Sequence, residues 1–104
     1  MDRVLNYVLK NFHKDISLKD AAEVAHMAEN SFSRYFSRRT RKRFISYVNE
    51  VRLNHASKLL IENGSNILDI SLNCGFNNLS NFNKQFKNFY RLSPSAYQKL
   101  YLTD

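Results

Sequence analysis

Two sets of four polar side chains recur along the chain with the spacing of a single helix face. Positions i, i+3, i+4 and i+7 of a helix lie on one side of it, so each set would form one continuous surface. Both sets hold short hydrogen-bonding side chains around a central cation, and neither holds a carboxylate. Asparagine can pair with adenine, and arginine or lysine with guanine or a phosphate, so these residue types suit the major groove of DNA. The first set is Asn30, Ser33, Arg34 and Ser37, and the second, fifty residues later, is Ser80, Asn83, Lys84 and Lys87.

The charge of the chain supports an anionic partner. The net charge at pH 7 is +7, which favours nucleic acid or an acidic membrane face. No acidic residue occurs from Ile70 to Thr103. A basic cluster directly after the first polar set would lie near backbone phosphates if that set contacts DNA. The cluster consists of Arg38, Arg39, Arg41, Lys42 and Arg43.

The elements that position these residues are predicted to be helices. The only glycines are Gly64 and Gly75 and the only proline is Pro94. An architecture of strands and turns would need more of these turn-forming residues. Apolar residues at helical spacing predict seven helices. In chain order these helices carry Val4, Leu5, Val8, Leu9 and Phe12; Ala21, Ala22, Val24 and Ala25; Phe32 and Phe36; the apolar residues from Phe44 to Asn63; Ile67, Ile70 and Leu72; Phe82, Phe86 and Phe89; and Tyr97 and Leu100.

Capping residues indicate where several of these helices begin and end. Ala28 is a poor cap for the third helix, whereas Gly64 suits the C-terminal end of the long helix. We expect Phe82, Phe86 and Phe89 to point into the core, opposite the second polar set. The predicted N-terminal signals are Ser17 with Asp20, Asn66 with Asp69, and Ser93 followed by Pro94.

The sequence also contains a degenerate internal duplication. Each copy has a short helix, a tight turn and a second helix, the layout of a helix-turn-helix, and the second copy has one extra residue before its second helix. The joining helix of about 20 residues spans roughly 30 Å, close to the roughly 34 Å between successive major grooves. One chain could therefore place two recognition helices in adjacent grooves. The residues superposed by the fifty-residue shift are Phe32 and Phe82, Arg34 and Lys84, Phe36 and Phe86, Arg41 and Arg91, and Tyr47 and Tyr97.

Over essentially its whole length the chain resembles the DNA-binding domain of the AraC/XylS family of bacterial transcription regulators. The resemblance rests on ILDISLNCGFNNLSNFNKQFKNFYRLSPSAY, residues 67–97, and on RLNHASKLL, residues 52–60. It implies an all-α domain whose third and sixth helices enter adjacent major grooves, and a regulator that activates transcription by touching RNA polymerase. The expected parts are a first helix-turn-helix subdomain at 1–43, a linker helix at 44–64 and a second helix-turn-helix subdomain at 65–104.

The resemblance also implies a set of contacts with DNA. Arg41 and Arg91 stand where the family often has glycine, at helix ends in the left-handed conformation, which costs arginine roughly 1 kcal/mol. The expected base contacts are Asn30, Ser33, Arg34, Leu79, Ser80, Asn83 and Lys84. The expected phosphate contacts are Ser37, Arg38, Arg39, Arg41, Lys42, Arg43, Lys87 and Arg91.

No catalytic or metal-binding arrangement stands out in the sequence. The three histidines, His13, His26 and His55, have no metal-ligand spacing with Cys74 or with one another. There are no paired carboxylates, no glycine-rich phosphate loop and no Ser/His/Asp arrangement above chance. Cys74, on the apolar side of a helix, is predicted to be a small buried hydrophobe. We therefore expect no enzyme activity, no cofactor and no metal.

Several alternatives stay open on the sequence alone. A basic helical protein-interaction domain could dock an acidic partner, and an RNA or membrane-surface binder is a further possibility. An enzyme is conceivable only as the targeting domain of a DNA-modifying protein. The lack of an apolar run of roughly 18 residues and of a secretory signal places the expected protein in the cytoplasm. The absence of a basic amphipathic helix with exposed large apolar residues counts against membranes, so we expect no membrane contact. We expect the domain alone to be monomeric and to be a fragment of a longer regulator.

Overall fold

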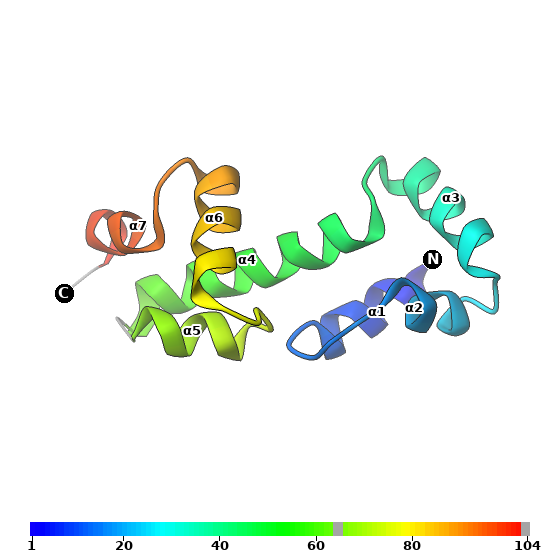
Figure 1. Cartoon of the computed structure of the whole chain (residues 1–104), viewed down its shortest axis with the longest axis horizontal. Coiled ribbons are helices and arrows are strands. Elements are labelled where there is room, and N and C mark those ends of the chain that lie inside the picture. The colour runs from blue at the N-terminus through cyan, green and yellow to red at the C-terminus, as the bar shows by residue number, and fades with distance from the viewer. Residues whose placement is uncertain (64–65, 103–104) are drawn as a thin grey trace. The chain divides into compact units, whose positions relative to one another are not determined.

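The computed structural model describes residues 1–63 and 66–102, except for the side chain of Asn63. Within these residues the chain forms seven α-helices and no strand (Figure 1). The predicted all-α class and the predicted number of helices are therefore confirmed. The helices are α1 (Asp2–Asn11), α2 (Leu18–Val24), α3 (Glu29–Thr40), α4 (Phe44–Asn63), α5 (Ile67–Asn73), α6 (Leu79–Tyr90) and α7 (Pro94–Tyr101).

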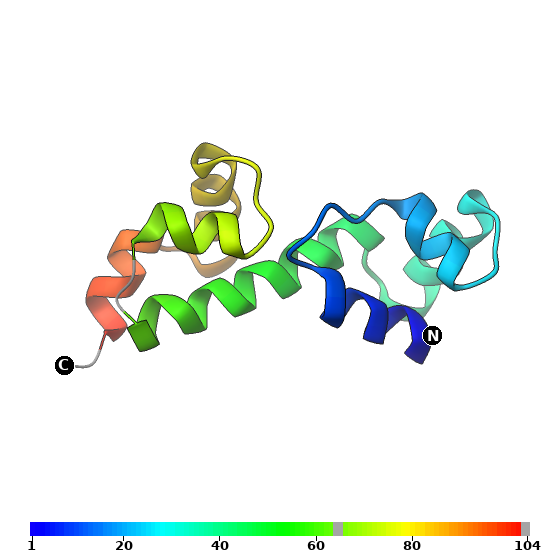
Figure 2. The same ribbon diagram turned by 90° about the horizontal axis from the view of Figure 1, so that it is seen from below.

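The chain divides into two compact units, Met1–Val51 and Arg52–Asp104. Each unit contains a pair of helices joined by a short turn, α2 with α3 and α5 with α6 (Figures 1 and 2). The helix α4 is continuous over 20 residues and supplies core residues to both units. Its bounds agree with the long helix predicted from the sequence, whereas the predicted cap Gly64 lies outside the described residues.

An aromatic core holds the first unit together. Phe32 and Phe36, one turn apart on α3, are both fully buried. Phe44 at the start of α4 packs edge-on against both of them, with ring centroids 5.6 and 5.4 Å away. Val4 and Val8 of α1 belong to the same cluster. Burying a side chain of this size stabilises the unit by about 1.5–3 kcal/mol, and it determines which face of α3 points outward.

The second unit repeats this arrangement around α6. Phe82 and Phe86 are fully buried, as the duplication predicts. Phe76 packs against Phe82 with ring centroids 5.1 Å apart, and Tyr97 of α7 packs against Phe86 at 5.2 Å. Cys74 is also fully buried in this core, which confirms its prediction as a small hydrophobe.

Side-chain caps begin all three helices that the sequence predicted to have them, and at α5 the Asn66 side chain accepts a hydrogen bond from the Leu68 backbone N–H at 2.8 Å. Ser17 and Asp20 form a complete capping box at the start of α2, and Ser93 accepts a hydrogen bond from the Ala96 backbone N–H. The N-cap of α3, Ala28, makes no side-chain hydrogen bond, in agreement with its expected weakness. At the equivalent place in the second unit, Asn78 caps α6 through the backbone N–H of Asn81 at 2.7 Å, a cap that the sequence prediction missed.

The turns inside the two helix-turn-helix pairs differ by one residue, as the sequence predicted. Four residues separate α2 from α3, and five separate α5 from α6. His26 in the first turn has φ 57°, and Gly75 in the second has φ 97°. Glycine adopts the left-handed conformation readily, whereas a residue with a Cβ does so at a cost. The first turn therefore carries backbone strain that the second avoids.

The predicted burial of Phe89 was wrong, because this side chain is 45% exposed. The neighbouring Tyr90 takes the inward position at the end of α6, with its ring centroid 4.6 Å from that of Phe86. The Tyr90 hydroxyl donates a hydrogen bond to Asn54 Oδ1 at 2.7 Å, which Phe89 could not replace. Three further residues that the sequence assigned to apolar faces are also exposed, namely Leu9, Leu72 and Leu100.

Candidate nucleic-acid interface

The first polar set lies on the outer side of α3, and we call it the α3 face. The burial of Phe32 and Phe36 turns the opposite side of the helix to solvent. Asn30 and Arg34 are exposed, whereas Ser33 and Ser37, the two remaining members, are partly buried. Among the described residues Arg34 has no ion-pair partner, so its full charge faces outward.

The second polar set forms an equivalent α6 face, comprising Ser80, Asn83, Lys84 and Lys87, all of which are exposed. Both of its lysines lack an ion-pair partner within the part of the chain that the structure describes. Leu79, also a predicted base contact, is partly buried at the first position of α6 and packs against the second core. Its outer part is thus an apolar edge beside the α6 face.

The ends of both helices have the left-handed geometry that the family resemblance implied. Arg41 has φ 60° and Arg91 has φ 66°, and each backbone N–H returns a hydrogen bond of 2.8 Å to its helix. Both arginines are exposed. Each arginine therefore places an exposed positive charge at the end of its helix, where a glycine would place none.

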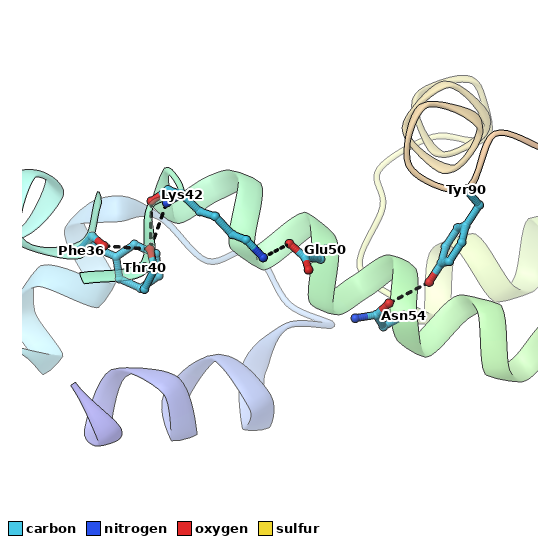
Figure 3. A network of polar contacts seen from close by, with 6 residues as sticks. All are labelled: Phe36, Thr40, Lys42, Glu50, Asn54 and Tyr90. Carbon is cyan, nitrogen blue, oxygen red and sulfur yellow. Dashed lines mark hydrogen bonds and ion pairs between the residues drawn. The ribbon is translucent and has the colours of Figure 1, made fainter. Parts of the chain in front are cut away.

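The basic cluster runs across the end of α3, and Thr40 holds the turn that follows the helix. Thr40 Oγ1 donates to the carbonyl oxygen of Phe36 at 2.8 Å and accepts from the backbone N–H of Lys42 at 3.2 Å. Lys42 Nζ in turn forms an ion pair with Glu50 Oε2 at 2.6 Å (Figure 3). Lys42, a predicted phosphate contact, is thus partly neutralised within its own unit. Unpaired cations among the described residues of the cluster are Arg38, Arg39, Arg41 and Arg43.

Within the second unit, one hydrogen bond ties the end of α6 to α4 and another ties α7 to α4. Tyr90, the last residue of α6, donates to Asn54 of α4, as Figure 3 shows. Gln98 of α7 donates from Nε2 to the carbonyl oxygen of Leu60 in α4 at 3.2 Å. The first bond orients the helix that carries the α6 face, and the second holds α7, whose Tyr97 packs against Phe86 of α6.

The sequence interpretation missed several exposed residues beside the two faces. Asn81 and Asn88 of α6 are exposed and extend its acid-free surface. Asn81 lies three residues before Lys84 and Asn88 four after it, so helical spacing was the signal that could have identified them. Glu29, at the first position of α3, is an exposed carboxylate next to Asn30. A negative charge there stabilises a helix N-terminus that lacks a side-chain cap.

The described residues offer little else for chemistry. Burial raises the pKa of the Cys74 thiol to about 11, so this group is protonated and unreactive near neutral pH. No group of three or more potential metal ligands occurs among the described residues. In the same residues, no helix combines the length and the apolar composition needed to cross a membrane.

Comparison with known proteins places these features in a family. A sequence profile described as a helix-turn-helix domain matches residues 21–100, which is most of the chain. The chain belongs to the AraC-type helix-turn-helix family. This AraC-type domain is accordingly a DNA-binding domain of the kind found in transcription regulators.

Two curated relatives indicate how large such regulators are. The AraC-type domain is 29% identical over 100 residues to the melibiose operon regulatory protein of Escherichia coli (strain K12), covering 96% of this chain and 33% of that protein. It is also 29% identical to the uncharacterized HTH-type transcriptional regulator YdeC of Bacillus subtilis (strain 168), covering 96% of this chain and 34% of the relative. The chain thus spans about a third of the length of these relatives.

Solved structures share the fold of the AraC-type domain. The C-terminal domain of AraT, a response regulator from Geobacillus stearothermophilus, superposes with a TM-score of 0.93 at 24% identity, covering 99% of this chain and 86% of that one. The DNA-binding domain of the global transcriptional factor AdpA, in complex with a target DNA, gives a TM-score of 0.91 at 23% identity and covers 96% and 90% of the two chains. At these identities the likeness concerns the fold alone.

Proposed function

We propose that this AraC-type domain binds double-stranded DNA sequence-specifically, with α3 and α6 entering adjacent major grooves. The carrying observation is that both helices expose a polar, acid-free face centred on a cation, Arg34 or Lys84, that has no ion-pair partner among the described residues. Such a cation retains its charge for guanine or phosphate oxygens. The 20 residues of α4 span about 30 Å, which is close to the groove repeat of about 34 Å.

The proposed contacts divide by chemistry. Side chains on the two faces read base edges, and Leu79 offers an apolar edge for a thymine methyl group. Cations at the ends of the helices neutralise phosphates and add affinity without sequence preference. The proposed base contacts are Asn30, Ser33, Arg34, Leu79, Ser80, Asn83 and Lys84, and the proposed phosphate contacts are Ser37, Arg38, Arg39, Arg41, Lys42, Arg43, Lys87 and Arg91.

A binding selection from random duplex DNA tests this proposal. The parent domain and the variants Arg34→Ala and Lys84→Ala are selected in parallel at near-physiological salt. We expect a motif of two short blocks about one turn of the DNA helix apart. Each variant should lose the base preference in one of the two blocks. Each substitution weakens binding to the selected site by about 1–3 kcal/mol.

Exposed cations outside both faces provide the matched controls. Lys10→Ala in α1 and Lys99→Ala in α7 also remove one positive charge from each unit, and both residues are exposed. These controls leave both blocks of the motif intact. If the parent yields no motif and binds every duplex equally weakly, the proposal is wrong and a domain that docks an acidic protein becomes the better description.

We further propose that the domain acts within a longer bacterial regulator in the cytoplasm and activates transcription by contact with RNA polymerase. The size of the relatives and the family of the chain support this assignment. Residues 1–43 and 65–104 would serve as the two helix-turn-helix subdomains and residues 44–64 as the linker helix. The isolated domain is expected to be monomeric, which sedimentation equilibrium would check.

A further inference from the structure

Glu29 places a carboxylate at the start of α3, directly before the α3 face. Its side chain is exposed and forms no ion pair among the described residues. Positions 29, 33 and 37 are four residues apart, so Glu29 continues the row of Ser33 and Ser37 by one turn toward the N-terminus of the helix. The recognition helix of a helix-turn-helix contacts base edges with the residues at this end. Glu29 therefore lies where the proposed function brings α3 against the bases, although it is outside the proposed contact set.

The duplication provides a second reason to place Glu29 beside the bases. A shift of fifty residues superposes Glu29 on Leu79, and each is the first residue of its helix. Leu79 is one of the proposed base contacts and offers an apolar edge to a thymine methyl group. The same position in the two units thus carries an apolar side chain in one and a negative charge in the other. Equivalent positions with such different chemistry cannot prefer the same base.

A carboxylate at this position limits the bases that the domain accepts. Entering the groove removes water from the carboxylate, which costs free energy unless a hydrogen-bond donor takes the place of the water. Glu29 has no cation as a partner within the part of the chain that the structure describes. The donor must therefore come from the DNA, and the phosphates carry negative charge and cannot provide it. A base edge is the remaining source.

Cytosine is the one base whose major-groove edge offers a donor without a neighbouring acceptor. Guanine presents the two acceptors N7 and O6, and thymine presents the acceptor O4 and its methyl group. Adenine presents its N6 amino group beside the acceptor N7, which repels a carboxylate. Cytosine presents its N4 amino group, from which a glutamate side chain can accept a hydrogen bond.

We propose that Glu29 selects cytosine at one position of the first block of the DNA target by accepting a hydrogen bond from the N4 amino group. This inference rests on the proposed function and adds a specificity-determining residue to it. The selection acts largely by rejection, because the carboxylate also repels the phosphates of every duplex. Cytosine offsets this repulsion and the other bases do not. Glu29 therefore lowers the affinity for random DNA while it raises the preference for the correct site.

Substitutions that change the chemistry of this one side chain test the proposal. The selection from random duplex DNA is repeated with Glu29→Gln and Glu29→Leu. The parent prefers cytosine at one position of the first block by about fivefold or more. In Glu29→Gln adenine replaces cytosine at that position, because glutamine pairs with N6 and N7 of adenine, and in Glu29→Leu thymine replaces it. The second block stays the same in both variants.

Fluorescence anisotropy with labelled duplexes provides an independent measurement. Glu29→Gln binds random duplex about twofold or more tighter than the parent, because a repulsive charge is lost. A misfolded variant could not produce this gain. The ratio of the affinities for the parent's selected site and for random duplex falls about fivefold or more. Glu23→Gln is the matched control, since it removes the same charge from an exposed position of α2 and leaves the selected motif unchanged.

The base preference separates this role from a purely structural one. A negative charge in the first turn also stabilises α3, and both variants lose this contribution. If both variants lower the melting temperature but select the parent motif, Glu29 serves only the helix and the inference is wrong. The proposed function then still stands on the two blocks and on the effect of Arg34→Ala. If the parent itself recovers no motif, the proposed function fails and the inference fails with it.

Discussion

Replacing Arg91 with glycine is expected to raise the stability of the domain while weakening its binding to DNA. Arg91 ends α6 with φ 66° and ψ 10°, in the left-handed region. Its side chain is exposed and has no ion-pair partner among the described residues. The backbone N–H of residue 91 bonds to the carbonyl oxygen of Lys87 at 2.8 Å, and glycine retains this bond. The substitution therefore removes strain and charge but no backbone contact.

The size of the stability change follows from two opposing effects. Left-handed geometry costs a residue with a Cβ about 1–2 kcal/mol, and glycine relieves this cost. Glycine also makes the unfolded chain more flexible, which lowers stability by about 0.4–1 kcal/mol. We expect the free energy of unfolding to rise by about 0.5–1 kcal/mol and the melting temperature by about 2–8 °C.

The loss of the guanidinium group acts in the other direction on binding. Affinity for every duplex falls, and the salt slope becomes less negative by about one, if Arg91 contacts a phosphate. Urea denaturation followed by circular dichroism measures the first effect, and fluorescence anisotropy with labelled duplex measures the second. The matched variant Arg91→Ala removes the same charge but keeps the Cβ, so it loses affinity without gaining stability. Equal stability of the glycine and alanine variants would refute the strain argument, and unchanged binding of both would refute the phosphate contact.

Three further predictions concern the second unit. Phe86→Ala is expected to lower the free energy of unfolding by about 3–5 kcal/mol, because Phe86 is fully buried. Phe89→Ala is expected to lower it by less than about 1 kcal/mol, because Phe89 is 45% exposed. Urea denaturation measures both changes, and equal losses would contradict the assigned burial. Cys74 is expected to react with iodoacetamide at pH 8 much faster in urea than in the folded protein, because burial raises the pKa of its thiol from 9.0 to about 11. Equal rates in the two conditions would show that the thiol is accessible in the folded protein and would contradict its burial. For the same reason the folded state holds this proton more tightly than the unfolded state, so stability falls as pH rises from about 9 to about 11.

Helical periodicity predicted the seven helices because the core is made by residues that repeat one or two turns apart. It failed at Phe89, whose angular position around α6 matches that of Phe82. Angular position does not reveal whether the core extends to the last turn of a helix. Here Tyr90 closes the core through a hydrogen bond to Asn54, 36 residues earlier in the chain, and local patterns carry no information about such a partner.

The exposed faces were also predictable, since they lie opposite buried aromatic residues of the same helix. Contacts between residues on either side of a turn between two helices could not be predicted from the sequence. Lys42 pairs with Glu50 across the left-handed bend at Arg41, at a separation of eight residues that the spacing rule for helices does not cover. His26 adopts a positive φ although it is not a glycine, so its residue type did not predict this conformation. Gly75 occupies the equivalent place in the second copy and also has a positive φ, which indicates that the turn itself requires this conformation.

The duplication constrains the inside of the two units more than their outer faces. The aromatic pairs are identical in both copies, Phe32 with Phe36 and Phe82 with Phe86, because the same packing must form twice. None of the four positions of the α3 face keeps its residue on the α6 face. A symmetric dimer presents two identical faces and therefore selects a palindromic target. Because the two faces of this chain differ at every position, they do not have to read the same bases. We therefore expect the two blocks of the selected motif to differ in sequence, and exchange of the four α3-face residues for those of the α6 face to make the blocks alike.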